Sequence, residues 1–282
     1  MSARRTVARE TSASGIALHS GLTVAMRLSP AAPGAGVRFR RSDLGAEIPA
    51  HYDRVSETRL GTVIAEGAAK VGVIEHLMAA VAGAEIDDLL VTLDGPEPPL
   101  LDGDALSFLA LIDGAGTREQ DAPRRSIRVL RPVAVEQGEA RASLSPAGLL
   151  IYDCEIDFAN PAIGHQAYRF AFSPAAFRAE IAPARTFGFL SELETLNKAN
   201  LARGASLENT LALSDTGLVN REKLRFEDEF VRHKILDAIG DMALAGAPLI
   251  GRFQGIRSGH ATNNAVLRSL FSDPANYEYV EL

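Results

Sequence analysis

The sequence predicts an α+β protein of two domains, because both halves mix strand and helix patterns and a polar segment separates them. A chain of 282 residues is long for one compact core and sufficient for two. The separating segment, GTREQDAPRRS at 116–126, is charged, contains proline and is flanked by apolar stretches. We therefore expect an N-terminal domain at 1–120 and a C-terminal domain at 121–282.

Four segments of the first half have clear periodic patterns. LTVAMRLSP at 22–30 alternates like a strand, and DDLLVTLDG at 87–95 has the pattern of a more buried strand. VIEHLMAAVAG at 73–83 has helical spacing and ends in glycine, which is typical of a helix terminus. DALSFLALIDGAG at 104–116 predicts a second helix, with Asp104 as its N-cap.

The second half repeats this mixture. SIRVLRPVAVEQG at 126–138 and LLIYDCEIDF at 149–158 have strand patterns, and PAAFRAEI at 174–181 predicts a short helix. A longer helix containing FVRHKILDAIGD is expected from about Leu224 to Gly246, with a proline beyond it. Three acidic residues would lie in its first turns, where the helix dipole favours them: Glu227, Asp228 and Glu229.

The composition is ordinary for a globular protein and argues against several kinds of partner. The net charge of −7 does not suit a nucleic-acid partner, although a local cationic pocket could bind an anionic small molecule. The single cysteine, Cys154, excludes an internal disulfide and fits a reducing compartment. No apolar stretch has the length of a signal peptide core or of a membrane span, so no membrane insertion is expected. We predict a cytoplasmic monomer.

A row of polar residues lies beside the apolar face of the long helix. His233, Asp237 and Asp241 follow one another in steps of four, which drift by only about 40° around a helix. They therefore share one stripe, and a histidine and a carboxylate so spaced can bind one metal ion. A solvated helix face with a histidine–aspartate hydrogen bond is the alternative.

Two further places suggest the same chemistry. Glu75 and His76 begin an otherwise apolar helix, so one can bind a metal while the other reaches a neighbouring water. A helix-start glutamate beside a buried histidine is the alternative. His260 follows Gly259 at an expected helix start, where Asp241 could hold it as an imidazolium. A polar loop histidine is the alternative.

Together these residues describe a hydrolytic zinc centre. His76, His233 and Asp237 would be three protein ligands, which leaves a fourth position for water. Glu75 would remove a proton from that water, and His260 would protonate the leaving group. The parts come from both halves of the chain, so we expect the site in a cleft between the domains. The reaction class is metal-assisted hydrolysis of an amide or ester.

Six strings spread along the chain form a specific combination: FEDEFVRHKILDAIGD, IEHL, ARTFGF, GIALHSG, LLDGDA and SGHATNN. In this combination the chain closely resembles the UDP-3-O-acyl-N-acetylglucosamine deacetylases, the LpxC family of lipid A biosynthesis. The resemblance implies two α+β domains, each a β-sheet with helices on one face, and the helices sandwiched at the domain interface. It also implies a zinc-dependent hydrolase that removes the N-acetyl group of UDP-3-O-acyl-N-acetylglucosamine and releases acetate.

The resemblance also assigns roles to individual residues. The family's zinc ligands fall on three positions: His76, His233 and Asp237. Its other catalytic groups fall on five: the general base Glu75, the general acid His260, the Asp241 that holds it, the oxyanion-stabilising Thr186 and the pocket lysine Lys234.

Expectations for substrate binding follow from the same resemblance. Lys234 and Arg257 are the candidate cations for the diphosphate, with a surface charge as the alternative for Arg257. Phe158 and Phe189 are expected near the uracil, with the core as the alternative. Phe187 is a further expected substrate-binding residue, and His19 is expected to line the pocket. The segment 189–206 matches the family's passage for the acyl chain, with helix packing as the alternative. Its expected lining consists of Leu190, Leu193, Leu196 and Leu201.

The sequence departs from the family pattern in one loop. Gly61 stands where many members have cysteine, and Arg59 stands where an apolar residue is familiar. An amidase for another acetylated sugar nucleotide and a non-catalytic protein that binds a UDP-lipid are the alternative functions. The intact set of catalytic residues argues against the second, because binding alone needs no general base. A nitrogen, nitrogen and oxygen ligand set would also accept iron(II) or cobalt(II).

Overall fold

The computed structural model describes residues 2–281, and its elements confirm the predicted α+β class. The N-terminal half forms a five-stranded sheet in the order β2-β3-β9-β4-β5. Its strands are β2 (Thr11–Ile16), β3 (Thr23–Pro30), β9 (Leu89–Leu93), β4 (Val37–Arg41) and β5 (Ala46–Pro49). The strands predicted at 22–30 and 87–95 are thus confirmed as β3 and β9, which pair with each other.

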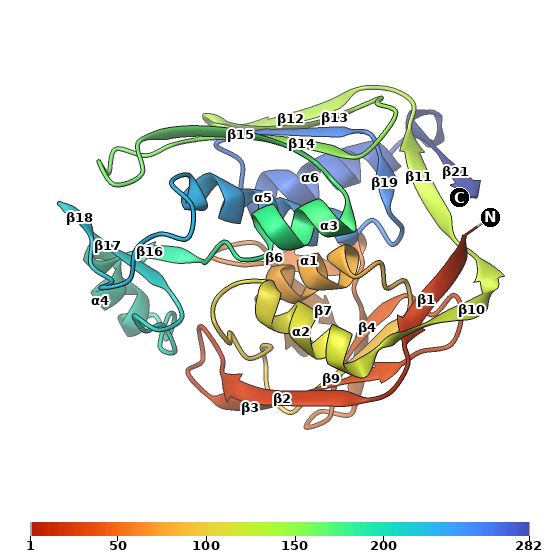
Figure 1. Ribbon diagram of the computed structural model, residues 1–282, viewed down its shortest axis with the longest axis horizontal. Coiled ribbons are helices and arrows are strands. Elements are labelled where there is room, and N and C mark those ends of the chain that lie inside the picture. The colour runs from red at the N-terminus through yellow and green to blue at the C-terminus, as the bar shows by residue number, and fades with distance from the viewer. Residues whose placement is uncertain (1, 282) are drawn as a thin grey trace.

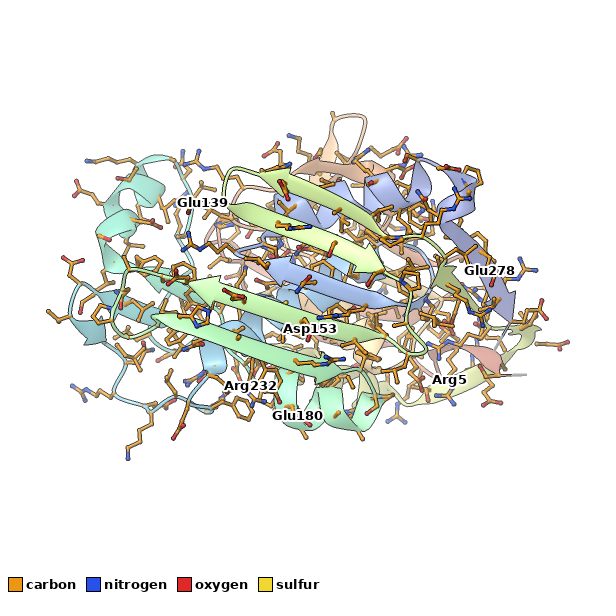
Figure 2. All side chains as sticks on the ribbon, turned by 90° about the horizontal axis from the view of Figure 1, so that it is seen from above. Arg5, Glu139, Asp153, Glu180, Arg232 and Glu278 are labelled. Atoms are coloured by element: carbon orange, nitrogen blue, oxygen red, sulfur yellow. The ribbon has the colours of Figure 1, made fainter. Side chains whose placement is uncertain are left out.

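The C-terminal half forms a second five-stranded sheet in the order β12-β13-β20-β14-β15. Its strands are β12 (Val133–Gln137), β13 (Ala140–Ser145), β20 (Arg252–Ile256), β14 (Ile151–Asp157) and β15 (His165–Ala171). Alternate residues of β14 are buried, so one face of this sheet packs on the interior and the other does not. Figure 2 shows this outer face, with Asp153 of β14 labelled on it.

Four smaller sheets complete the strands. One joins β6 (Val55–Glu57), β7 (Val63–Glu66) and β8 (Ala69–Val71), and another joins β16 (Phe187–Phe189), β17 (Leu211–Ser214) and β18 (Gly217–Leu218). The remaining two are β1 (Ala3–Val7) with β10 (Thr117–Pro123), and β11 (Arg125–Val129) with β19 (Leu249–Ile250) and β21 (Tyr277–Glu281). The polar segment 116–126 therefore lies largely in strands, and strand partners change at Arg124. The division into domains at 120/121 stays a prediction.

The helices lie between the two large sheets, as Figure 1 shows. They are α1 (Glu75–Gly83), α2 (Leu106–Ala115), α3 (Pro174–Ala176), α5 (Glu229–Ala243) and α6 (His260–Phe271), while α4 (Leu190–Lys198) lies apart beside β16 to β18. Short 3-10 turns occur at Tyr52–Arg54 and Pro274–Asn276, and a π-helical turn at Phe177–Ile181 continues α3. Helices with one sheet on each side must be apolar on more than one face, which explains why α1 is buried almost throughout. Within residues 2–281 no helix is long and apolar enough to span a membrane.

The predicted limits of two helices need correction. The helix expected from Leu224 to Gly246 is α5, which begins at Glu229 and ends at Ala243. It begins late because the Glu229 carboxylate accepts a hydrogen bond from the Arg225 backbone, which closes a turn before the helix. Of the three acidic residues expected in its first turns, Glu229 alone lies there. Helix α2 begins at Leu106, so Asp104 precedes the N-cap position, yet its Oδ1 still accepts from Ser107 N at 3.1 Å.

One glycine determines how closely α1 and α5 approach. A Cβ on Gly240 of α5 would lie 2.0 Å from the carbonyl oxygen of Glu75, at the start of α1. Any other residue would collide with that backbone, so the backbone of α1 lies directly against α5 at this glycine. The contact brings the first turn of α1, from the N-terminal half, against the polar stripe of α5, from the C-terminal half.

Candidate metal centre and active site

Three side chains from α1 and α5 converge as a metal-binding group would. His76, His233 and Asp237 are buried, and one ligand atom of each lies within 4.8 Å of the others. The Asp237 Oδ1 atom is 3.6 Å from His76 Nε2 and 3.4 Å from His233 Nε2. Ligands that hold zinc tetrahedrally at its usual bond lengths are separated by about 3.4 Å. The geometry therefore fits a small divalent cation.

The protonation of these ligands also suits a metal. His233 Nδ1 lies 3.0 Å from the carbonyl oxygen of Ala184, so it carries the proton and leaves Nε2 free to bind. Burial lowers the pKa of His233 to about 4, which keeps its ring neutral. Burial alone would raise the pKa of Asp237, but Lys234 and His233 hold it well below the ordinary value. The Lys234 ammonium donates to Asp237 Oδ2 at 2.7 Å, so the other carboxylate oxygen, Oδ1, is the one that faces the two histidines.

Glu75 lies beside this group without belonging to it. Its Oε2 accepts a hydrogen bond from the backbone N–H of Thr62 at 3.0 Å, and its Oε1 is 3.8 Å from His260 Nε2. Burial raises the pKa of the Glu75 carboxyl, which makes it a stronger base. Gly61 has a φ of +148° and a Cβ there would lie 3.1 Å from Glu75 Oε1, so the departure from cysteine at this position lies directly beside the carboxylate.

His260 and Asp241 form the pair that the sequence predicts. His260 Nδ1 lies 2.9 Å from Asp241 Oδ2, and Asp241 is buried. Burial alone would lower the pKa of His260, but Asp241 and Glu75 raise it to about 9. His260 is therefore an imidazolium at neutral pH, with its Nε2 directed toward Glu75.

Two hydrogen bonds to Asp241 were not predicted from the sequence. Thr62 Oγ1 donates to Asp241 Oδ1 at 2.5 Å, and Asn263 Nδ2 donates to Oδ2 at 2.9 Å. Asn263 lies in the quoted string SGHATNN and could have been found as the neighbour of His260 on the next helical turn. Thr62 has no such signal, because it lies 179 positions from Asp241 along the chain.

A buried ion pair anchors the segment that carries Thr186. Glu229 is fully buried, and its Oε1 accepts from both the backbone N–H and the Nε of Arg185 at 3.0 and 2.8 Å. Thr186 itself is held by two other segments of the chain: its N–H donates to Gly103 O, and its carbonyl accepts from Leu211 N. The acidic residue expected only to favour a helix start thus positions the loop next to the metal group.

A cavity of about 650 Å³ runs from the metal group to α4. Most predicted site residues line it: Glu75, His76, His233, Lys234, Asp237, His260, Thr186, His19, Phe158, Phe187, Phe189, Leu190, Leu193 and Leu196. Its wall is therefore polar near the metal group and apolar along α4.

Two predicted binding residues do not line this cavity. The Arg257 guanidinium is paired with the carboxylates of Glu139 and Asp157 instead. Leu201 is half-buried beyond the end of α4, where its N–H donates to Leu196 O. His19, by contrast, lies at the wall with Nε2 2.9 Å from Leu60 O and Nδ1 accepting from Ala202 N. Two further histidines lie near the surface: His51 is partly exposed beside Asp53, and His165 is exposed beside Glu155.

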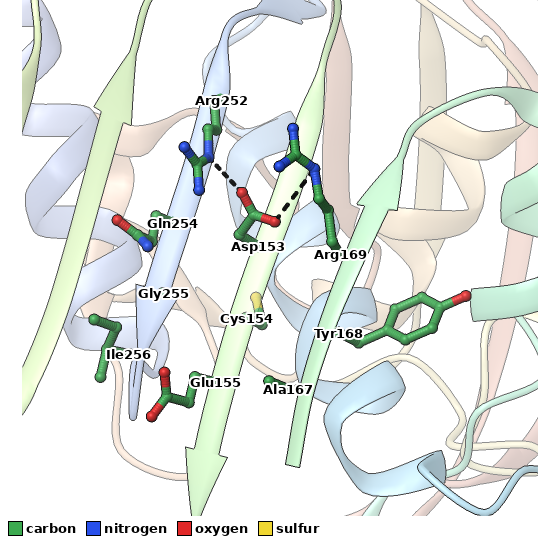
Figure 3. Close-up of a pocket in the computed structure, with 10 residues that line it drawn as sticks. All are labelled: Asp153, Cys154, Glu155, Ala167, Tyr168, Arg169, Arg252, Gln254, Gly255 and Ile256. Atoms are coloured by element: carbon green, nitrogen blue, oxygen red, sulfur yellow. Dashed lines mark hydrogen bonds and ion pairs between the residues drawn. The ribbon is translucent and has the colours of Figure 1, made fainter.

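A shallower pocket of about 330 Å³ lies on the outer face of the second sheet. Figure 3 shows Asp153 between Arg252 and Arg169 in this pocket, with Cys154 of the same strand. It includes no residue of the metal group or of the His260–Asp241 pair.

The comparison with known families agrees with this geometry. The sequence model described as LpxC, UDP-3-O-acyl N-acetylglycosamine deacetylase, matches residues 4–272. The chain belongs to this family. Its resemblance to LpxC proteins, inferred above from six strings, is thereby confirmed over nearly the whole chain.

Individual relatives cover almost the same length. A UDP-3-O-acyl-N-acetylglucosamine deacetylase of Myxococcus xanthus is 47% identical over 279 residues, 98% of this chain and 89% of that protein. Proteins of the same description from an Anaeromyxobacter species and from Wolinella succinogenes are 45% and 42% identical, and the matches cover 92% and 94% of those proteins. LpxC proteins are metalloenzymes, which fits the buried group of two histidines and one aspartate.

The division between ligands and base can be tested by metal content. His233→Ala should lose stoichiometric metal after dialysis, because it removes one of three ligand atoms. Glu75→Gln should retain it, because Glu75 lies outside the group and its amide can be accommodated. Inductively coupled plasma mass spectrometry of the folded variants would measure this. Loss of metal from Glu75→Gln would show that Glu75 is itself a ligand.

Proposed function

We propose that this protein removes the N-acetyl group from UDP-3-O-acyl-N-acetylglucosamine and releases acetate, as a metal-dependent deacetylase of lipid A biosynthesis. One observation carries the proposal: a metal-ligand group, a buried carboxylate base and a charged histidine meet at the polar end of a cavity whose other end is apolar. Membership in the LpxC family supports the substrate. We further propose a cytoplasmic location.

Zinc is the metal that we propose for the site. Two imidazole nitrogens and one carboxylate oxygen form the ligand set of many catalytic zinc sites, in which a further position stays open. When bound, zinc would polarise the amide carbonyl and lower the pKa of a water molecule. His76, His233 and Asp237 would hold it. Iron(II) would accept the same ligands, and metal analysis of the purified protein distinguishes the two.

The residues around the group then divide the proton transfers between them. Glu75 accepts a proton from the attacking water as the water oxygen bonds to the acetyl carbon. His260, an imidazolium at neutral pH, donates a proton from Nε2 to the sugar nitrogen as the carbon–nitrogen bond breaks. The products are acetate and the free amine. Base and acid lie close together, since Glu75 Oε1 and His260 Nε2 are 3.8 Å apart.

Two more side chains would stabilise the negative charge that develops on the carbonyl oxygen. Thr186 can donate its hydroxyl hydrogen, and Lys234 places a positive charge in the cavity wall. Burial alone would lower the pKa of Lys234, but Asp237 raises it, so the ammonium stays charged. This charge also suits a diphosphate in an otherwise acidic protein.

The rest of the cavity has surfaces for the other parts of the substrate. Phe158 packs against Phe187 and Phe189 with ring centroids 5.8 Å apart in each case, and we propose that these half-buried rings contact the uracil. Leu190, Leu193 and Leu196 present an apolar wall for the acyl chain. His19 would complete the pocket, while the proposed roles of Arg257 and Leu201 in binding have no support from the cavity.

The direct test is a deacetylation assay on UDP-3-O-acyl-N-acetylglucosamine. We expect a chelator to abolish acetate release and stoichiometric zinc to restore it, because the metal group is required for the chemistry. Glu75→Gln should lower kcat by several orders of magnitude, roughly 10²–10⁴-fold for loss of a general base. Turnover that survives verified removal of metal would contradict the mechanism. Activity confined to other acetylated sugar nucleotides would change the substrate alone.

The pH dependence of kcat/KM should reveal the His260–Asp241 pair. The rate should fall at high pH as His260 loses its proton, with a midpoint near its pKa of about 9. Asp241→Asn removes the largest influence raising that pKa, so this alkaline limb should move down by about 1–3 units. Asp153→Asn, an aspartate on the outer sheet face, is the matched control. An unmoved limb in Asp241→Asn would assign it to another ionisation.

The apolar wall can be tested with a pair of leucines. Each buried methylene contributes about 0.8 kcal/mol at most, so a long acyl chain supplies several kcal/mol for binding and positioning. Leu193→Asp should therefore lower kcat/KM for the long-chain substrate at least tenfold. It should leave the slow turnover of UDP-N-acetylglucosamine nearly unchanged. Leu201→Asp, in the same segment but outside the cavity, should affect neither. Equal losses on both substrates would show that Leu193 is only part of the core.

A further inference from the structure

Thr62 is a buried residue that contacts both halves of the proton-transfer machinery. Its backbone N–H donates to Glu75 Oε2 at 3.0 Å, and its side-chain Oγ1 donates to Asp241 Oδ1 at 2.5 Å. Its solvent exposure is 1%. It belongs to the N-terminal half, between β6 and β7, whereas Asp241 lies on α5 of the C-terminal half. Thr62 therefore connects the general base, Glu75, to Asp241, the carboxylate that is paired with the general acid His260.

The carboxylate of Asp241 is held at both of its oxygens. Oδ2 lies 2.9 Å from both His260 Nδ1 and Asn263 Nδ2, whereas Thr62 is the donor to Oδ1. Because Asp241 is buried, loss of the Thr62 hydroxyl would leave Oδ1 without a donor among the side chains described. An unsatisfied buried carboxylate oxygen is unfavourable, so the carboxylate would leave its present orientation. The His260 ring would then lose its fixed partner.

The local structure of Thr62 makes it a rigid support. Its carbonyl oxygen accepts from Ile74 N at 3.4 Å, so its main chain is bound to the start of α1 on both sides. The preceding Gly61 adopts the positive φ that lets the chain pass beside Glu75. A β-branched side chain also restricts χ1, so the hydroxyl direction is well defined. Thr62 thus couples the position of α1 to that of the Asp241 carboxylate on α5.

We propose that Thr62 is a positioning residue for deacetylation, which holds Glu75 and the Asp241–His260 pair in one frame. The inference rests on the proposed function for its kinetic consequences, but its geometry stands without it. Since Thr62 acts through Asp241, it affects the transition state more than substrate binding. A buried threonine that only satisfies its hydrogen bonds would contribute to stability and would not affect kcat separately.

Two substitutions separate these roles. Thr62→Val keeps the shape, the β-branch and the bond to Glu75 but removes the hydroxyl. We expect it to lower kcat roughly ten- to hundredfold with little change in KM. Thr62→Ser keeps the hydroxyl and should recover most of the rate. In an Asp241→Ala background, Thr62→Val should have no further effect, because the group through which it acts is gone.

A second buried threonine supplies the control. Thr6 is fully buried on β1, its Oγ1 accepts from Ala31 N at 3.2 Å, and it does not line the cavity. Thr6→Val measures what loss of a buried threonine hydroxyl does to the melting temperature and to kcat through the fold alone. The proposal is overturned if Thr62→Val resembles Thr6→Val in both quantities. It is also overturned if Thr62→Val lowers kcat by the same factor in the Asp241→Ala background.

A spectroscopic measurement makes the result independent of turnover. In the zinc-loaded protein, the Nδ1 proton of His260 should give a downfield nuclear magnetic resonance signal, assigned by its absence in His260→Gln. Thr62→Val should broaden or shift this signal, whereas Thr62→Ser and Thr6→Val should not. If this pattern appears but no deacetylation occurs, the positioning role stands and the proposed function fails. An unchanged signal in Thr62→Val would reject the positioning role.

Discussion

The contact between α1 and α5 at Gly240 is the constraint on which the site depends. Because glycine lets the α1 backbone lie against α5, the first turn of α1 reaches the polar stripe of α5. His76 then lies at ligand distance from Asp237, and Glu75 lies close to His260. Two helices from opposite halves of the chain thus make one catalytic surface. The large sheets on either side keep the helices in place by burying their remaining apolar faces.

The charges of the site are stable because each has a partner in the interior. Burial of an isolated charge is unfavourable, and breaking a buried pair leaves its partner uncompensated. Asp237 is paired with Lys234, Asp241 with His260, and Glu229 with Arg185. The Asp241–His260 pair also keeps His260 charged, whereas burial keeps the metal-binding His233 neutral. Burial and pairing together therefore set the protonation states that hydrolysis needs.

The cavity combines two requirements that conflict in one protein surface. Hydrolysis needs a polar, charged wall, whereas a hydrophobic chain needs an apolar one. The fold separates them: the polar wall comes from helices between the sheets, and the apolar wall from α4 and its neighbours at the edge of the molecule. None of the α4 residues is fully buried, so its leucines face the cavity without a core of their own.

The sequence by itself determined the fold class, most elements and two members of the metal group. These rest on local patterns: strand alternation in 22–30, helical spacing in 73–83, and steps of four that keep His233 and Asp237 on one face of α5. Such patterns depend on neighbours in the chain, so periodicity reveals them. The start of α5 was missed because it depends on Glu229 and Arg225, whose contact competes with helix propensity.

Tertiary structure alone decided the contacts between distant segments. Thr62 meets Asp241 across 179 positions, and no period or motif marks such a pair. The same limit applies to Arg257, a candidate cation by its position in the chain, whose charge is paired with Glu139 and Asp157 in the folded protein. It applies also to Leu201, which shares a segment with Leu193 yet lies outside the cavity. Spacing along the chain defines the face of one element, whereas packing decides what that face meets.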